Sequence, residues 1–315
     1  MLYDEKSLKR LENKDFGEYE RRLQKYLAQD RKELIKEYYK LRTGDSLNID
    51  NPVTYNEKLQ WLKYYWRDNL VYRCADKYEA RFVVAEMGCP KIVDNPLFIY
   101  KAVSDIDFSV LPESFVLKAT HSSGFNLFVQ NKNNLDIERV KNVFEKILKI
   151  QYYTAKCEWC YEHIEPKIIC ENLLQINTDA PLDYKFFCFH GEVKFVQILT
   201  ANKWVYNREP IELIVDKDFK RMDFSYGFPN LLNVSKSNDF DKMVEYAEKL
   251  SKPFPHVRID LYNPQNGVIK FGEFTFFPGA GYDEFNPREY GVAVGNWLNL
   301  NNIEKITETK QQKWN

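Results

Sequence analysis

Residues 257–281 read VRIDLYNPQNGVIKFGEFTFFPGAG, and this stretch decides how the rest of the chain is interpreted. Two runs of alternating apolar and polar residues flank NPQNG, a sequence typical of tight turns, so we predict a β-hairpin. Arg258 and Asp260 project to one face of the first strand, and Glu273 lies near the end of the second. A glycine-rich exit, Pro-Gly-Ala-Gly, follows the second strand, and such loops often carry function.

The register of this hairpin determines whether its charged residues converge. A four-residue loop pairs Asn263 with Val268, which places Arg258 opposite Glu273 and Asp260 diagonal to Glu273, about 7–8 Å away between Cβ atoms. Two acids and an arginine on one face are costly to desolvate unless a cation or a phosphate joins them. The alternative is a solvated outer face on which Arg258 and Glu273 form a surface ion pair.

The hairpin resembles the metal-binding end of the ATP-grasp fold, which carboxylate–amine ligases such as D-alanine–D-alanine ligase share. The resemblance rests on Arg-Ile-Asp, the thirteen residues from Asp260 to Glu273, and the Pro-Gly that follows. The spelling GEFTF, with Thr275 where most relatives have Asn, is similar to the TupA-like branch, which is linked to teichuronopeptide and capsular polysaccharide synthesis. The resemblance implies that Asp260, Glu273 and Thr275 bind Mg²⁺ and that Arg258 is catalytic, stabilising charge on the transferring phosphate.

Composition bounds the class of protein. The chain has 315 residues and a formal net charge of −1, which gives no electrostatic basis for binding nucleic acid. No charged-then-apolar leader and no run of about eighteen apolar residues is present, which predicts a cytoplasmic protein without a signal peptide or transmembrane segment. Cys157 and Cys160 have CxxC spacing, so zinc or redox chemistry stays open beside an incidental role in packing.

A candidate phosphate-binding loop lies upstream. Lys118 is the one charged residue of the apolar run 115–119, a position that favours a nearby anion. The small residues that follow leave backbone N–H groups free to surround phosphate oxygens; they are His121, Ser122, Ser123 and Gly124. A plain hairpin turn is the alternative, and His121 either donates to a phosphate or shapes the loop.

Further residues gain a role from the resemblance. Lys77, after a capping Asp76, corresponds to the lysine that reaches the α-phosphate, and Lys118 to the family's second lysine. Glu171 and Leu174 correspond to the hinge that binds the adenine edge. Asp183 resembles the acid that takes the ribose hydroxyls, and Lys185 faces the phosphates; an exposed Asp183–Lys185 pair on an edge strand is the alternative.

We therefore expect an α+β chain with an ATP-grasp two-lobed fold and a nucleotide cleft between the lobes, preceded by a helical N-terminal region. The expected divisions are a helical cap at 1–75, a small lobe at 76–170, a large lobe with the metal site at 171–300 and a polar tail at 301–315.

The resemblance implies an ATP-dependent carboxylate–amine ligase with ATP and Mg²⁺, which forms an amide through an acyl phosphate. The expected partners are a small or glycan-linked carboxylate, such as a uronic acid of a bacterial capsule, and an amine or amino acid. Two alternatives stay open: a phosphotransferase acting on a sugar or another hydroxyl, and a glycosyltransferase-type or non-catalytic protein of polysaccharide biosynthesis.

Overall fold

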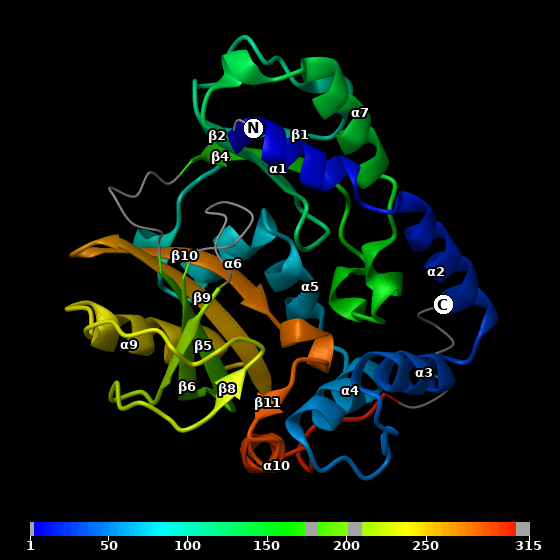
Figure 1. Cartoon of the computed structure of the whole chain (residues 1–315), viewed down its shortest axis with the longest axis vertical. Coiled ribbons are helices and arrows are strands. Elements are labelled where there is room, and N and C mark those ends of the chain that lie inside the picture. Colours follow the sequence, from blue (N-terminus) through cyan, green and yellow to red (C-terminus); the bar gives the residue numbers. More distant parts are fainter. Residues whose placement is uncertain (1–2, 174–181, 201–209, 307–315) are drawn as a thin grey trace.

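The computed structural model describes residues 3–173, 182–200 and 210–306 and has two lobes, each built on an antiparallel sheet (Figure 1). Its helices are α1 (Tyr3–Glu12), α2 (Phe16–Ala28), α3 (Arg31–Thr43), α4 (Tyr55–Tyr65), α5 (Asn69–Ala75), α6 (Glu79–Glu86), α7 (Ile137–Ile147), α9 (Phe240–Ser251) and α10 (Tyr290–Gly295). Its strands are β1 (Phe98–Tyr100), β2 (Phe115–Ala119), β3 (Asn126–Val129), β4 (Ile168–Asn172), β5 (Asp183–Phe189), β6 (Glu192–Leu199), β7 (Glu212–Val215), β8 (Ser225–Tyr226), β9 (His256–Gln265), β10 (Val268–Thr275) and β11 (Phe285–Asn286).

The small lobe is a four-stranded sheet in the order β1-β4-β2-β3, with helices α1 and α7 packed on it (Figure 1). Alternate residues of β2 and β3 point into one core with the apolar face of α7, whose first turn is capped by Asp136. The core side chains include Phe115, Leu117, Leu127, Val129, Val140 and Phe144. This lobe therefore presents the loop between β2 and β3 from a rigid support.

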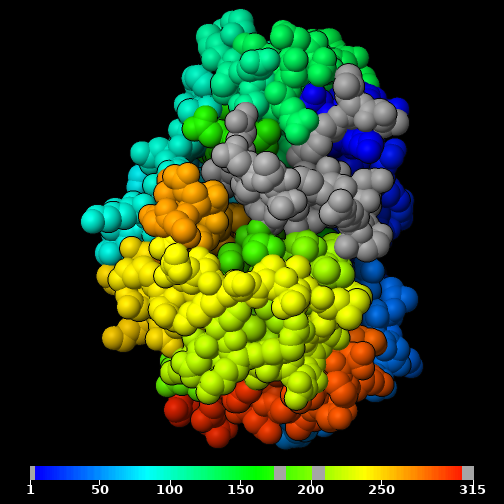
Figure 2. Space-filling model, turned by 60° about the vertical axis from the view of Figure 1, so that its left-hand side comes forward, coloured from blue at the N-terminus to red at the C-terminus, as the bar shows by residue number. Residues whose placement is uncertain are grey.

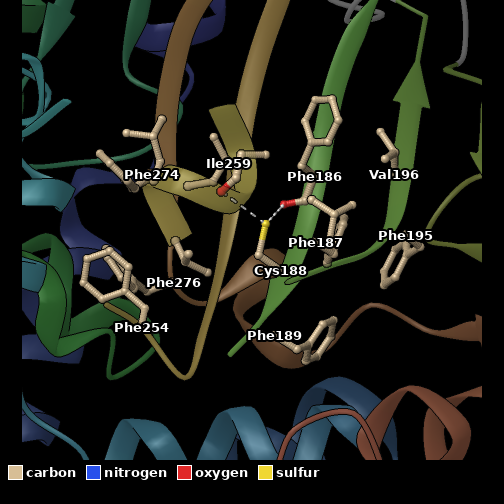
Figure 3. Close-up of a cluster of buried hydrophobic side chains, with 14 of the residues drawn as sticks. Phe186, Phe187, Cys188, Phe189, Phe195, Val196, Phe254, Ile259, Phe274 and Phe276 are labelled. Carbon is tan, nitrogen blue, oxygen red and sulfur yellow. Dashed lines mark hydrogen bonds between the residues drawn. The ribbon is translucent and has the colours of Figure 1, made fainter. Parts of the chain in front are cut away.

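The large lobe is a five-stranded sheet in the order β10-β9-β5-β6-β7, with α9 packed against it. Its core is rich in phenylalanine, and Figure 3 shows Phe186, Phe187 and Phe189 of β5 beside Phe195 of β6 and Phe274 and Phe276 of the hairpin. In the middle of this cluster, the buried Cys188 thiol donates to the Phe186 and Ala247 carbonyls. Because β5 is the central strand, Asp183 and Lys185 are not an exposed edge pair.

The N-terminal helices divide among three apolar clusters. Leu8 and Leu11 of α1 belong to the small-lobe core, whereas α2 and α3 pack with each other and with Cys157 in a cluster of their own. Helix α4 starts at a capping box formed by Thr54 and Glu57, and it joins the large-lobe core through Leu59 and other residues. The helices thus contribute to both lobes.

The predicted hairpin is present as β9 and β10, but the predicted register is wrong. Glu273 lies opposite Asp260, and Thr275 lies opposite Arg258. The loop is the two-residue turn at positions 266 and 267, which Asn-Gly favours.

The register differs from the prediction because the loop has two residues rather than four, so Val268 pairs with Gln265 and not with Asn263. Two irregularities of the ladder then offset each other. An extra residue lies on β9 between the pairs Val268–Gln265 and Lys270–Tyr262, where Pro264 has no N–H to donate. A second extra residue, Gly272, lies on β10. A Cβ atom at Gly272 would be 2.8 Å from the Tyr262 ring and 3.0 Å from the Asp260 carbonyl, so only glycine fits there without displacement.

Candidate active site

One face of the β9–β10 hairpin carries a connected set of charged groups. The Arg258 guanidinium donates to both oxygens of Asp260, from Nε to Oδ1 at 2.6 Å and from Nη2 to Oδ2 at 2.7 Å. Nη2 also donates to Thr275 Oγ1 at 3.0 Å and to Glu273 Oε1 at 3.4 Å. The Thr275 hydroxyl donates to Glu273 at 3.0 Å. All four residues predicted from this hairpin therefore lie together.

Lys185 joins this set from the neighbouring strand β5, where it lies opposite Asp260. Its Nζ is 3.0 Å from Asp260 Oδ2 and 3.5 Å from Asp183 Oδ2. Burial lowers the pKa of Lys185, but the charges of Asp260 and Asp183 outweigh burial and raise it above its ordinary value. Burial likewise raises the pKa of Asp260, yet Arg258 and Lys185 bring it below the ordinary value. Both groups are therefore charged at neutral pH.

The small sheet and helix α6, whose apolar residues pack in the large-lobe core, supply a second group of cations. Lys118 of β2 forms an ion pair with Glu171 of β4 at 2.5 Å, and Arg81 of α6 contacts the same carboxylate. Burial, and next the positive charges of Arg81 and Lys77, lower the pKa of Lys118 to about 7, although Glu273 and Asp183 favour the charged ammonium. With a pKa near neutral pH, the Lys118 amine is readily protonated when an anion binds beside it.

Lys77 links the predicted phosphate loop to α6. Its backbone N–H donates to the Thr120 carbonyl at 3.3 Å, and its ammonium donates to the Ser122 carbonyl. The Asp76 carboxylate accepts from the backbone N–H groups of Tyr78 and Glu79, just before α6 begins. Burial lowers the pKa of Lys77, an effect opposed by Glu273 and Asp76. Lys77 is therefore within electrostatic range of the hairpin acid Glu273.

A cleft lies where these two groups face each other. Lys77, Arg81, Lys118, Asn126 and Glu171 line it from α6 and the small sheet, and Tyr262, Lys270 and Glu273 line it from the hairpin. Figure 2 shows the hairpin tip, in orange, at the junction between the cyan-green upper lobe and the yellow lower lobe. Lys77, Lys118, Glu171 and Glu273 were predicted from the sequence, and the structure places all four on one cleft.

Other predicted residues lie beside the cleft rather than on its surface. Asp183, Lys185, Arg258 and Asp260 form the layer behind Glu273, as described above. The Glu171 carboxylate forms ion pairs with Lys118 and Arg81, which the sequence did not predict. Leu174 lies outside the described residues.

The loop residues 121–124 split into two pairs. His121 and Ser122 are buried, and within the described residues their side chains make no hydrogen bond of good geometry. Burial, helped by the charge of Lys77, lowers the pKa of His121 to about 4, so its ring is neutral at neutral pH. Ser123 and Gly124 are exposed at the tip, where Gly124 has φ +79°. Only the tip pair is open to a ligand.

Sequence reasoning gave no role to Arg81, Tyr262 or Lys270. Arg81 was identified only as a helix residue, and its partner Glu171 is 90 positions away in the sequence. Lys270 lies on the hairpin and forms an ion pair with Asp94, which ties β10 to the segment before β1. The sequence did contain a signal for Lys270, because this basic residue lies on the same predicted hairpin as Asp260 and Glu273.

The hairpin face has the donor chemistry that Mg²⁺ requires. Asp260 and Glu273 lie directly opposite each other with hard oxygen ligands, and the Thr275 hydroxyl is a weaker third oxygen. The Glu273 side chain is 35% exposed toward the cleft, whereas that of Asp260 is 5% exposed and held by two cations. Within residues 3–173, 182–200 and 210–306, no group of three or more His, Cys, Asp or Glu side chains is arranged to hold a metal.

The CxxC cysteines are buried, and Cys157 and Cys160 belong to different apolar clusters.

Comparison with known proteins fixes the class. A family model described as TupA-like ATPgrasp matches residues 57–299, which is well over half of the chain. The protein is therefore an ATP-grasp protein. Within that class, it belongs to the TupA-like ATP-grasp family. No curated protein matches the sequence.

Solved structures with a similar chain path include two ligases. An L-amino acid ligase from Bacillus licheniformis has 12% sequence identity and a TM-score of 0.44, with 76% of this chain and 52% of that chain covered. A D-alanine–D-alanine ligase from Bacillus anthracis, complexed with ATP, has 15% identity and a TM-score of 0.40, with 70% and 62% covered. The chain thus spans less than two thirds of the length of either ligase. In the part of the chain that the structure describes, no helix is long and apolar enough to cross a bilayer.

Proposed function

We propose that the protein is an ATP-dependent, ADP-forming carboxylate–amine ligase. The observation that carries the proposal is the convergence on one cleft of Lys118 from the small sheet, Lys77 from the segment between α5 and α6, and Glu273 with its hairpin neighbours. Phosphoryl transfer depends on positioning and on electrostatic stabilisation more than on covalent chemistry of the protein, and this cleft supplies charges of both signs. Membership of the TupA-like ATP-grasp family supports the same reaction class.

Each residue takes a role that suits its place. Lys77 and Lys118 hold the phosphates, together with backbone N–H groups at Ser123 and Gly124. Glu171, with the segment that follows it and includes Leu174, adjoins the adenine, Asp183 takes the ribose hydroxyls, and His121 and Ser122 shape the loop. Asp260 and Glu273, with Thr275, would hold Mg²⁺, which neutralises charge on the β- and γ-phosphates when bound.

The reaction proceeds in two steps. The substrate carboxylate attacks the γ-phosphorus and ADP leaves, which gives an acyl phosphate. An amine then attacks the acyl carbon, inorganic phosphate leaves, and the amine loses a proton to give the amide. Arg258 lies beside Glu273 and Thr275 and stabilises the negative charge that develops on the transferring phosphate and on the tetrahedral intermediate.

The proposed carboxylate is a uronic acid of a bacterial surface polysaccharide, such as a capsule, and the proposed amine is an amino acid or a small amine. The family's TupA-like character supports this substrate class. The test is a screen of ADP release with Mg·ATP, a panel of uronic acids and a mixture of amines. Release that requires both a carboxylate and an amine supports the ligase. Release with a sugar that lacks a carboxylate indicates a phosphotransferase, and no release with any pair removes the proposed activity.

A further inference from the structure

A second hollow lies outside the ATP cleft, between helices α2 and α3 and the segment that carries Ala155 and Lys156. We call it the basic groove. The charged side chains that line it are Arg21, Arg22, Lys25, Arg42 and Lys156 against Glu18 and Glu37. Five cations against two carboxylates leave a net charge of +3, although the whole chain has a net charge of −1. The exposed Leu41 and the partly exposed Tyr282 add apolar surface, whereas Tyr38 is only 8% exposed.

The groove is fixed to the active site by a buried lysine. Lys63 of α4 is 1% exposed, and its ammonium donates to the Lys156 carbonyl at 3.0 Å and to the Ala280 carbonyl at 2.7 Å. Its Nζ also lies 4.8 Å from the centre of the Tyr282 ring. One ammonium therefore holds together a wall of the groove and the loop Pro278–Gly281, which follows the strand that carries Glu273 and Thr275.

Two cations of the groove form no ion pair. Arg21 and Arg22 pair with Glu18, and Lys25 pairs with Glu37. By contrast, the side chains of Arg42 and Lys156 make no ion pair or hydrogen bond with the rest of the described chain.

Asp283, which follows the loop Pro278–Gly281, interacts electrostatically with a cation of the groove and with one of the hairpin. Burial raises the pKa of Asp283, whereas Lys156 and Arg258 oppose that effect, so the carboxylate is close to both the groove and the hairpin arginine. The Asp283 side chain also lies against Gly279 of the loop.

We propose that the basic groove binds a chain of acidic sugars, so that the carboxylate substrate is presented as part of an oligosaccharide. This proposal rests on the proposed ligase function and specifies its substrate. Guanidinium and ammonium groups form charge-assisted hydrogen bonds with uronate carboxylates, and tyrosine faces offer apolar surface to sugar rings. Polyphosphate would use the cations but would leave the apolar surface of Leu41 and Tyr282 without a partner.

The test measures binding without nucleotide. Oligogalacturonate is titrated into the full-length protein by calorimetry at low salt, alongside a neutral galactan of the same length and a polyphosphate of the same charge. We expect the double variant Arg42→Gln, Lys156→Gln to bind oligogalacturonate about tenfold more weakly. The control Lys101→Gln, Lys141→Gln removes two exposed cations of the small lobe and should bind as the wild type does.

The outcomes separate the groove from the ligase activity. Loss of oligogalacturonate binding in the groove variant, with an unchanged unfolding temperature and the control intact, supports the groove. Equal binding by the groove variant and the wild type, or tighter binding of polyphosphate or galactan, overturns it. ADP release with a monomeric uronic acid but no oligogalacturonate binding overturns the groove and leaves the ligase standing. Groove-dependent binding without ADP release for any carboxylate supports the groove and removes the ligase.

Discussion

Asp260 lies directly opposite Glu273 on the neighbouring strands β9 and β10, and Arg258 donates to both carboxylates. Directly opposed residues of an antiparallel pair have Cβ atoms about 4.5–5.5 Å apart, close enough for two carboxylates to share a divalent ion. The positive charges of Arg258 and Lys185 balance Asp260 in the structure. Glu273, which is more exposed and held less closely, is the carboxylate that faces incoming ligands.

Glu273→Gln should therefore reduce turnover by about 100-fold or more, because a neutral amide holds Mg²⁺ poorly and leaves phosphate charge without compensation. Stability should change little, since Glu273 is only partly buried. The measurement is ADP release across a magnesium titration. Glu284→Gln, a change of the same type at an exposed position, is the control. Wild-type turnover and magnesium dependence in Glu273→Gln would show that the hairpin does not hold the metal.

Lys118→Met should weaken ATP binding about tenfold or more, because a charge-assisted contact to phosphate is lost. Unfolding should stay within about 1 kcal/mol of the wild type, because Arg81 still contacts the Glu171 carboxylate that Lys118 leaves. Calorimetry gives the affinity and urea unfolding gives the stability. Lys141→Met, on the same lobe, should leave both values unchanged. An unaltered ATP affinity in Lys118→Met would remove Lys118 from the phosphate site.

ATP binding should be coupled to proton uptake at Lys118. The pKa of Lys118 is about 7 in the free protein, so much of it is neutral above neutral pH. A nearby phosphate favours the ammonium and raises the pKa, so a proton is taken up and affinity falls as the pH rises above about 7. At about pH 8.5, the binding enthalpy should vary with the ionisation enthalpy of the buffer, and Lys118→Arg should abolish that variation. A buffer-independent enthalpy in the wild type would contradict this assignment.

Gly281→Ala should lower the free energy of unfolding by about 3 kcal/mol. A Cβ atom there would be 2.4 Å from Gln60 Nε2 and 3.0 Å from Leu59 Cβ, and the residue has φ +69°. Gly267→Ala is a matched control, because φ is +77° but no atom lies within 4 Å, so only the left-handed conformation costs about 1–2 kcal/mol. Urea unfolding compares the two variants. Equal losses would mean that the Pro278–Gly281 loop is not packed tightly on α4.

The presence of the strands that form the site could be predicted from the sequence, but the register in which they pair could not. The β9–β10 hairpin follows from local alternation and turn residues, so its presence was predicted correctly. The register was wrong because the predicted loop of four residues is a two-residue turn, which moves every pair of the hairpin. The extra residue near Pro264 and the bulge at Gly272 shift the pairing in opposite directions and cancel, and neither has a signal in simple alternation.

Contacts between residues far apart in the chain could not be predicted from the sequence either. Arg81 meets Glu171 only because α6 packs beside the small sheet, and no periodicity links positions so far apart. The same limit applies to Lys63, which has the helical spacing of an ordinary core residue but holds the loop after the hairpin. Its ammonium is explained by the carbonyls of Lys156 and Ala280, which only the folded chain brings together.

Trapping with hydroxylamine tests the central claim most directly. The protein, Mg·ATP, a uronic acid and hydroxylamine are incubated together, and the products are analysed by mass spectrometry. An acyl phosphate is electrophilic at carbon, so the ligase account predicts a hydroxamate of the uronic acid and one ADP for each hydroxamate formed. A stable sugar phosphate ester with no hydroxamate, formed equally well from a sugar that lacks a carboxylate, would contradict it.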